Sequence, residues 1–116
     1  MAKYLVLYDS ELTAMETMEN ASEEDIKENM ARWIKWKEES EKKVKVDFGM
    51  PLQPIGRVTP GGLIDSDSNV SGHSFLEGTE EDVIKVLEEH PHLKRPGSTI
   101  ELFEVLELPE LQHSND

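Results

Sequence analysis

The chain has four histidines, the one residue type whose ordinary pKa lies near neutral pH. His90 and His92 stand one residue apart, directly after an expected helix. A proton-transferring enzyme needs such a base beside a carboxylate or a phenol. The sequence therefore offers three catalytic candidates, His92, His90 and Asp65, and three binding candidates, Tyr8, His73 and Trp36.

The same residues also have ordinary structural explanations. His90 precedes a proline and so ends its helix, where a histidine ring caps the C-terminus favourably. His92 would then anchor the turn that follows, and Trp36 fits a core, a dimer contact or a pocket wall equally well. No nucleophile elbow or phosphate-binding loop is present to fix a reaction. Whether the protein is an enzyme stays open at the level of the sequence.

Two spacings are similar to metal motifs, and neither is complete. Residues 65–69, Asp-Ser-Asp-Ser-Asn, open like a calcium-binding loop, but the glycine and the glutamate that should follow are missing. His90 and His92 offer two imidazoles without a marked third ligand. We therefore expect no metal and no cofactor. Residues 65–69 are expected to be a polar loop whose side chains bond to nearby backbone amides.

The composition is that of one acidic domain. The chain of 116 residues has 25 acidic and 12 basic side chains and a net charge of -13, which disfavours nucleic acid and anionic membranes as partners. It has no cysteine, no signal peptide and no apolar run that could span a membrane, so we expect a cytoplasmic protein. Residues 1–108 are expected to form the domain, and residues 109–116 a polar tail.

Apolar runs and turn signals predict strands that alternate with two main helices. Ser22 and Thr79 are the expected N-caps of these helices. Residues 9–21 are expected to be a loop with room for one helical turn, and residues 44–48 either a strand or the end of the first helix. The remaining elements are strands at 3–8, 55–59, 63–65, 70–77 and 99–106, and helices at 22–43 and 79–89.

The longer helix has an apolar stripe that recurs every three or four residues, which predicts that this face packs against the sheet. Trp36 lies on the flank of that stripe. Glu28 and Arg32 stand four residues apart on the opposite side, where an ion pair is expected. The stripe consists of Ile26, Met30, Trp33 and Ile34, and the second helix should bury Val83, Ile84 and Leu87.

This order of elements predicts an α+β fold, a ferredoxin-like βαββαβ sandwich with both helices on one face of an antiparallel sheet. The other face of the sheet would be bare, with Phe75 and Phe103 on it. We expect a homodimer that packs two such faces together, because a small core benefits from further burial. Strand alternation puts His73 on the face of Phe75, which makes His92 the better candidate for a base in a pocket.

Four stretches that together cover most of the chain resemble the YCII-related family of the dimeric α+β barrel superfamily. The resemblance implies the ferredoxin-like fold, a homodimer and a pocket between helices and sheet. The stretches are KYLVLY at 3–8, MARWIKW at 30–36 with GMPL at 49–52, SDSNVSGHSFLE at 66–77, and HPHL through PGSTIE at 90–101.

The chain departs from the family where activity has been assigned. Some members carry a histidine–aspartate pair with the histidine early in the chain, whereas the first histidine here is His73. A related branch has Asp-Gly-Pro-Phe where this chain has residues 65–69. We expect a homodimer that binds or transforms a small-molecule ligand, and the alternative is a non-enzymatic binding or interaction subunit on the same fold.

Overall fold

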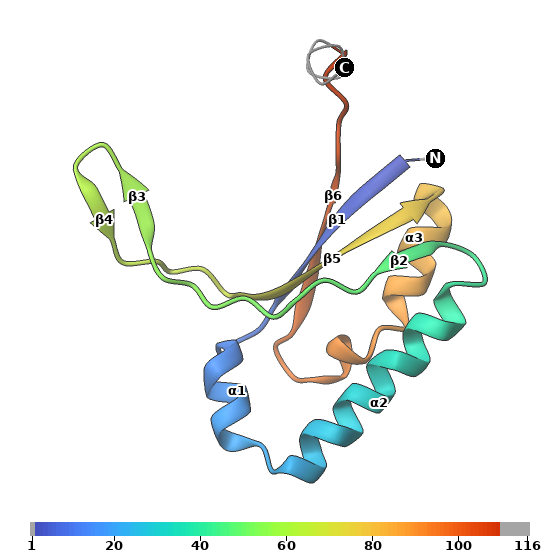
Figure 1. Ribbon diagram of the computed structural model, residues 1–116, viewed down its shortest axis with the longest axis horizontal. Coiled ribbons are helices and arrows are strands. Elements are labelled where there is room, and N and C mark those ends of the chain that lie inside the picture. Colours follow the sequence, from blue (N-terminus) through green and yellow to red (C-terminus); the bar gives the residue numbers. More distant parts are fainter. Residues whose placement is uncertain (1, 110–116) are drawn as a thin grey trace.

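The computed structural model describes residues 2–109 of the chain. Within this range it is an α+β protein with a four-stranded antiparallel sheet, a separate two-stranded hairpin and three α-helices (Figure 1). None of the helices in this range is long and apolar enough to cross a membrane. The expected tail lies outside the described residues except for Pro109.

The sheet has its first strand in the middle, and its strands follow the order β2-β5-β1-β6. β1 pairs with β5 on one side and with β6 on the other, and every pairing is antiparallel. Leu5 of β1 therefore lies between Phe75 of β5 and Phe103 of β6. The strands are β1 (Ala2–Asp9), β2 (Lys45–Asp47), β5 (Val70–Gly78) and β6 (Thr99–Glu104).

Each helix begins at a side chain that caps its first turn. The hydroxyls of Ser22 and Thr79 accept bonds from the backbone N–H three residues on, as expected. Thr13 and Glu16 form a reciprocal capping box, which turns part of the expected loop into a helix of two turns. The helices are α1 (Ala14–Asn20), α2 (Glu23–Ser40) and α3 (Glu80–Glu88), with a 3₁₀ turn η1 (Pro91–Lys94) after α3.

One face of the sheet carries the core. Alternate residues of β1 point to this face, where Tyr4, Val6 and Tyr8 are buried, and Leu76 of β5 joins them. Helices α2 and α3 both contribute to this cluster, so both cover the same face. Their buried side chains are Trp36 from α2 and Val83, Val86 and Leu87 from α3.

Only Trp33 of the predicted apolar stripe of α2 packs against the core, and for the other three residues the predicted packing is wrong. Trp36 and Ser40 are the buried residues of this helix, whereas Ile26, Met30 and Ile34 are about half exposed. The cause lies in how the helix runs: only its C-terminal half reaches the sheet, and its N-terminal half follows α1 away from it (Figure 1). In α3 a similar shift exposes Ile84 and buries Val86 in its place.

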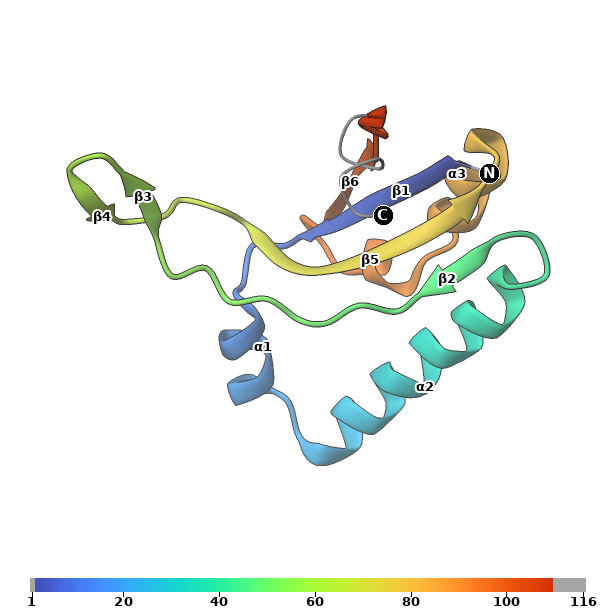
Figure 2. The same cartoon turned by 45° about the horizontal axis from the view of Figure 1, so that its top comes forward.

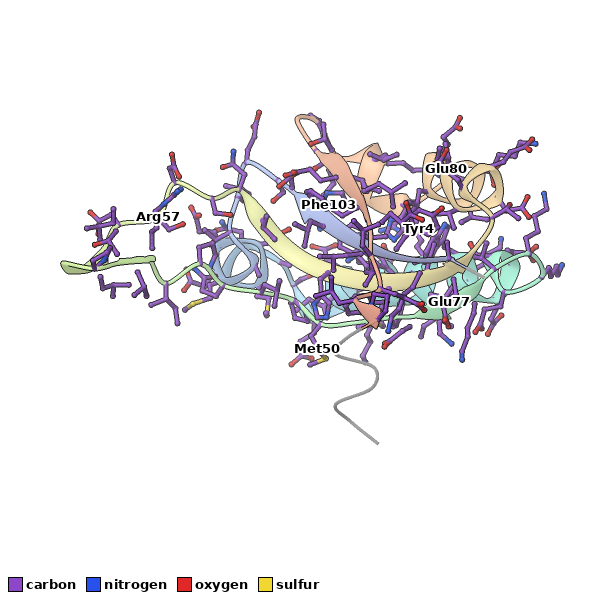
Figure 3. The ribbon with its side chains drawn as sticks, turned by 90° about the horizontal axis from the view of Figure 1, so that it is seen from above. Tyr4, Met50, Arg57, Glu77, Glu80 and Phe103 are labelled. Atoms are coloured by element: carbon purple, nitrogen blue, oxygen red, sulfur yellow. The ribbon has the colours of Figure 1, made fainter. Side chains whose placement is uncertain are left out.

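The strands expected around the Pro-Gly-Gly turn do form, but they do not join the main sheet. β3 (Arg57–Thr59) and β4 (Gly62–Ile64) pair only with each other. Gly62 has a φ of 119°, a conformation that favours glycine at this turn. The hairpin projects beyond the sheet, and Figure 3 shows Arg57 far from the sheet residue Phe103.

Candidate functional site

A cavity of about 410 Å³ lies where α1 and the first half of α2 stand off from the sheet. Its walls come from the ends of β1 and the start of β5, from the segment after β2, from both helices and from η1. The segment after β2, which includes Met50, is held along β5 by bonds from His73 N to Met50 O and from Leu52 N to Ser71 O. The cavity therefore has one rigid wall of sheet and one wall of helices.

The helical wall is mainly apolar. Met18 of α1 and Ile26, Met30 and Trp33 of α2 line the cavity. Three of these are stripe residues that the sequence assigned to packing on the sheet. Because Ile26 and Met30 face the cavity and are about half exposed, apolar surface is left open to a ligand.

Tyr8 lines the cavity and is held in place by a short chain of hydrogen bonds. Its hydroxyl lies 2.8 Å from Ser74 Oγ, which in turn donates to the carbonyl of Phe48 at 2.7 Å. Since Ser74 has one proton to give, Tyr8 must donate to Ser74. Burial raises the pKa of Tyr8 to about 12, so the phenol is neutral at pH 7 and serves as a fixed wall residue rather than a base.

His92 is buried, lines the cavity and ties two strand ends together. Its Nε2 lies 2.8 Å from the carbonyl of Asp9 and 3.1 Å from that of Thr99. A ring nitrogen between two carbonyl oxygens must carry a proton. In the neutral ring this leaves Nδ1 as the acceptor, so the tautomer of His92 is set by the ends of β1 and β6.

His90 is enclosed by aromatic rings and does not line the cavity. Its ring centroid lies 4.9 Å from that of Tyr8, 4.4 Å from Trp33 and 4.2 Å from Trp36. Nδ1 accepts from the backbone N–H of His92 at 2.9 Å, and the buried Nε2 has no oxygen or nitrogen partner among residues 2–109. Desolvation, with a further contribution from His92, lowers the pKa of His90 to about 3. His90 is thus a neutral core residue that starts η1, not a helix C-cap.

The other three candidates are His73, Trp36 and Asp65, of which only His73 lines the cavity. His73 lies opposite Leu7 of β1 and lines the cavity, and its ring packs edge to face against Phe75, on the same side of the strand. Trp36 is a core residue whose Nε1 donates to the carbonyl of Val86 at 2.7 Å. Asp65 is exposed at the end of β4 and belongs to the base of the hairpin.

The loop that contains Asp65 has the polar character expected of it. Ser66 Oγ accepts from Ser68 N, and Ser68 Oγ accepts from Val70 N. Asp67 instead pairs with Arg57 at 3.1 Å, which ties the loop to the hairpin. These side chains are engaged locally.

A carboxyl pair that the sequence did not single out lies at the edge of the bare face. Glu101 is opposite Leu7, and a hydrogen bond to Asp9 together with its charge raises the pKa of Glu101. The pair belongs to the bare face and not to the cavity.

Removing divalent metal is expected to leave the stability of the protein unchanged. Within residues 2–109 no three histidine, cysteine, aspartate or glutamate side chains are grouped so as to hold an ion. Thermal melts with and without a chelator should therefore superpose. A fall of several degrees on chelation that zinc or calcium reverses would contradict this prediction.

No protein-family model, curated protein or solved structure matches this chain.

Proposed function

We propose that the protein is a homodimer of ferredoxin-like topology that binds a small, largely apolar molecule in the cavity between α1, α2 and the sheet. The strand order β2-β5-β1-β6, with two helices on one face, supports this topology. It also supports the resemblance to the YCII-related family, which rests on the sequence stretches quoted above.

The observation that carries the binding proposal is the cavity itself. A volume of about 410 Å³ lies within the range of ligand pockets, which are mostly apolar with a few polar groups. Trp33 and Met30 supply apolar surface, and Tyr8 and His92 are already held by hydrogen bonds before a ligand arrives. Such a preformed site loses little entropy on binding.

Transformation of the ligand is the second candidate function, and the geometry of His92 favours it. With Nε2 bonded to two backbone carbonyls, Nδ1 is the ring nitrogen left to act as a general base. The neighbouring groups give it limited help, because Tyr8 stays protonated and Asp65 lies on the hairpin. Binding is therefore the primary proposal, and catalysis would depend on His92 alone among the predicted residues.

The substitution Met30→Glu is expected to weaken binding of the neutral fluorophore N-phenyl-1-naphthylamine by at least roughly tenfold, because it buries a charge against an apolar ligand. Met30 lines the cavity and is 52% exposed, so the fold should tolerate the change. Fluorescence titration measures the affinity.

Met15→Glu is the matched control. Met15 is 53% exposed on the neighbouring helix and is not among the residues that line the cavity. It should bind the fluorophore as the wild type does. Equal binding by the wild type and the Met30 variant, or equal loss in both variants, would refute the cavity as the binding site.

A further inference from the structure

The apolar cavity adjoins a second hollow that is lined by three cations, from which we infer that the ligand is an amphiphile with an anionic head. Its apolar body would occupy the cavity, and its carboxylate or phosphate oxygens would lie against Arg32, Lys94 and Arg95. This inference deepens the proposed function and rests on it.

The second hollow has a volume of about 470 Å³ and lies between α1, α2 and η1. It shares five wall residues with the apolar cavity, so the two spaces border one another along a common wall. Arg95 is one of them and therefore stands where an apolar body would meet its head. The shared residues are Thr17, Ala21, Asp25, Asn29 and Arg95.

Positive charge gathers at this hollow in a strongly acidic protein. Arg32, Lys94 and Arg95 are three of only 12 basic residues in a chain with a net charge of -13. Arg32 lies on α2 and the other two at the end of η1, so the fold brings together charges far apart in sequence. A local excess of cations on an acidic surface is a site to which anions are steered.

These three cations are not neutralised by the described residues. No carboxylate in residues 2–109 lies within 4.0 Å of any of them, and the expected pair between Glu28 and Arg32 is not formed. One acid, Asp25, does line the hollow, but its carboxylate accepts from the backbone of Ser22 at 3.3 Å in the α2 capping box. The hollow is therefore lined by three cations and one carboxylate, which leaves an excess of positive charge.

The backbone under Arg95 is held in place from the sheet. Arg95 N donates to the carbonyl of His92 at 3.3 Å, and the ring of His92 is bonded to the ends of β1 and β6. The guanidinium thus starts from a fixed point beside the cavity. Arginine is suited to this role because its planar group binds two oxygens of a carboxylate or phosphate at once.

Affinity should depend on both the charge of the ligand's head and the length of its apolar chain. Octanoate is expected to bind at least roughly tenfold more tightly than 1-octanol at low salt, since a charge-assisted bond adds to the same apolar contact. From hexanoate to octanoate, each added methylene should raise affinity about fourfold, which corresponds to about 0.8 kcal/mol. Octyl phosphate in place of octanoate distinguishes a phosphate head from a carboxylate. Displacement of N-phenyl-1-naphthylamine gives each affinity.

The charge is tested by Arg95→Gln, which should reduce the advantage of octanoate over 1-octanol, because one of the three cations is lost and the apolar contact is kept. Lys35→Gln is the control, because Lys35 is an exposed cation on α2 that lines neither hollow. Octanoate and 1-octanol binding equally to the wild type, or losing affinity equally in the Arg95 variant, would overturn the anionic head. If the fluorophore binds and Met30→Glu abolishes that binding, the cavity is still supported as the binding site even when the anionic head is refuted. If neither fluorophore nor alkyl compounds bind, the proposed function fails with the inference.

Discussion

Lowering the pH from 7 to 5 is expected to reduce the free energy of unfolding by about 2 kcal/mol through His90 alone. His90 is 1% exposed, and its pKa is lowered to about 3 by desolvation among the rings of Trp33, Trp36 and Tyr8. In the unfolded chain its pKa returns to about 6.5. The unfolded state therefore binds more protons between these values. The contribution of His90 to the free energy of unfolding is therefore fully present above pH 6.5 and is lost as the pH drops towards 3.

Ordinary carboxylates titrate below the window between pH 7 and 5, so histidines dominate it, and comparison with a His90 variant separates the contribution of His90. Urea denaturation at several pH values gives the slope. His90→Asn should flatten it, because the asparagine oxygen can still accept from His92 N but does not titrate. The variant is expected to be less stable at every pH, since it leaves a space among the aromatic rings.

A second measurement does not depend on the variant. The ring proton signals of His90 in the wild-type protein should not shift between pH 7 and 5. Titration of that ring near pH 6.5 in the folded state, or equal pH slopes for wild type and variant, would contradict a buried neutral histidine.

The sequence predicted the frame of this fold because strands and capped helices leave local signals. The alternation of side chains along residues 70–77 correctly placed Gly72, Ser74 and Leu76 together on one face of the strand, and this face is buried. Ser22 and Thr79 marked the helix starts that the structure has. The capping box of Thr13 and Glu16 was also present in the sequence, and it is the signal that could have turned the expected loop into α1.

The sequence could not predict what each apolar surface would meet. Ile26, Met30 and Trp33 fit a packing stripe, yet periodicity does not say how far a helix stays against its sheet. Here α1 carries the start of α2 away from the strands, and the stripe becomes a cavity wall. Figure 2 shows α2 to one side of the sheet with α1 at its far end.

The charged part of the site is hidden from the sequence for a related reason. Basic residues are few and scattered, so the composition argued against nucleic acid and anionic membranes as partners and gave no sign of a local anion site. Folding brings Arg32 beside Arg95, which is 63 positions further along the chain. Asp65 was a predicted site residue that folding instead takes away from the cavity. It directly follows the hairpin of β3 and β4, and no local sequence pattern shows that this hairpin stands apart from the main sheet.

Substitution of Phe103 by Asp is expected to turn the proposed dimer into monomers at micromolar concentration. Phe103 lies on the bare sheet face beside Leu5, and the ring of Phe75 lies across Leu5 from it. In a twofold dimer each copy would bury a carboxylate, at a cost of about 2 kcal/mol per copy or more. Two copies together correspond to roughly a thousandfold rise in Kd.

The fold of the single chain should survive this change, because Phe103 is 46% exposed before any partner binds. Ile84→Asp is the matched control: Ile84 is 42% exposed, but it lies on α3, on the opposite side of the sheet. Light scattering should give twice 13.2 kDa for the wild type and the control, and 13.2 kDa for the Phe103 variant. Circular dichroism should show all three folded. A wild type of monomer mass would refute the dimer, and dissociation of the Ile84 variant as well would move the interface away from the bare face.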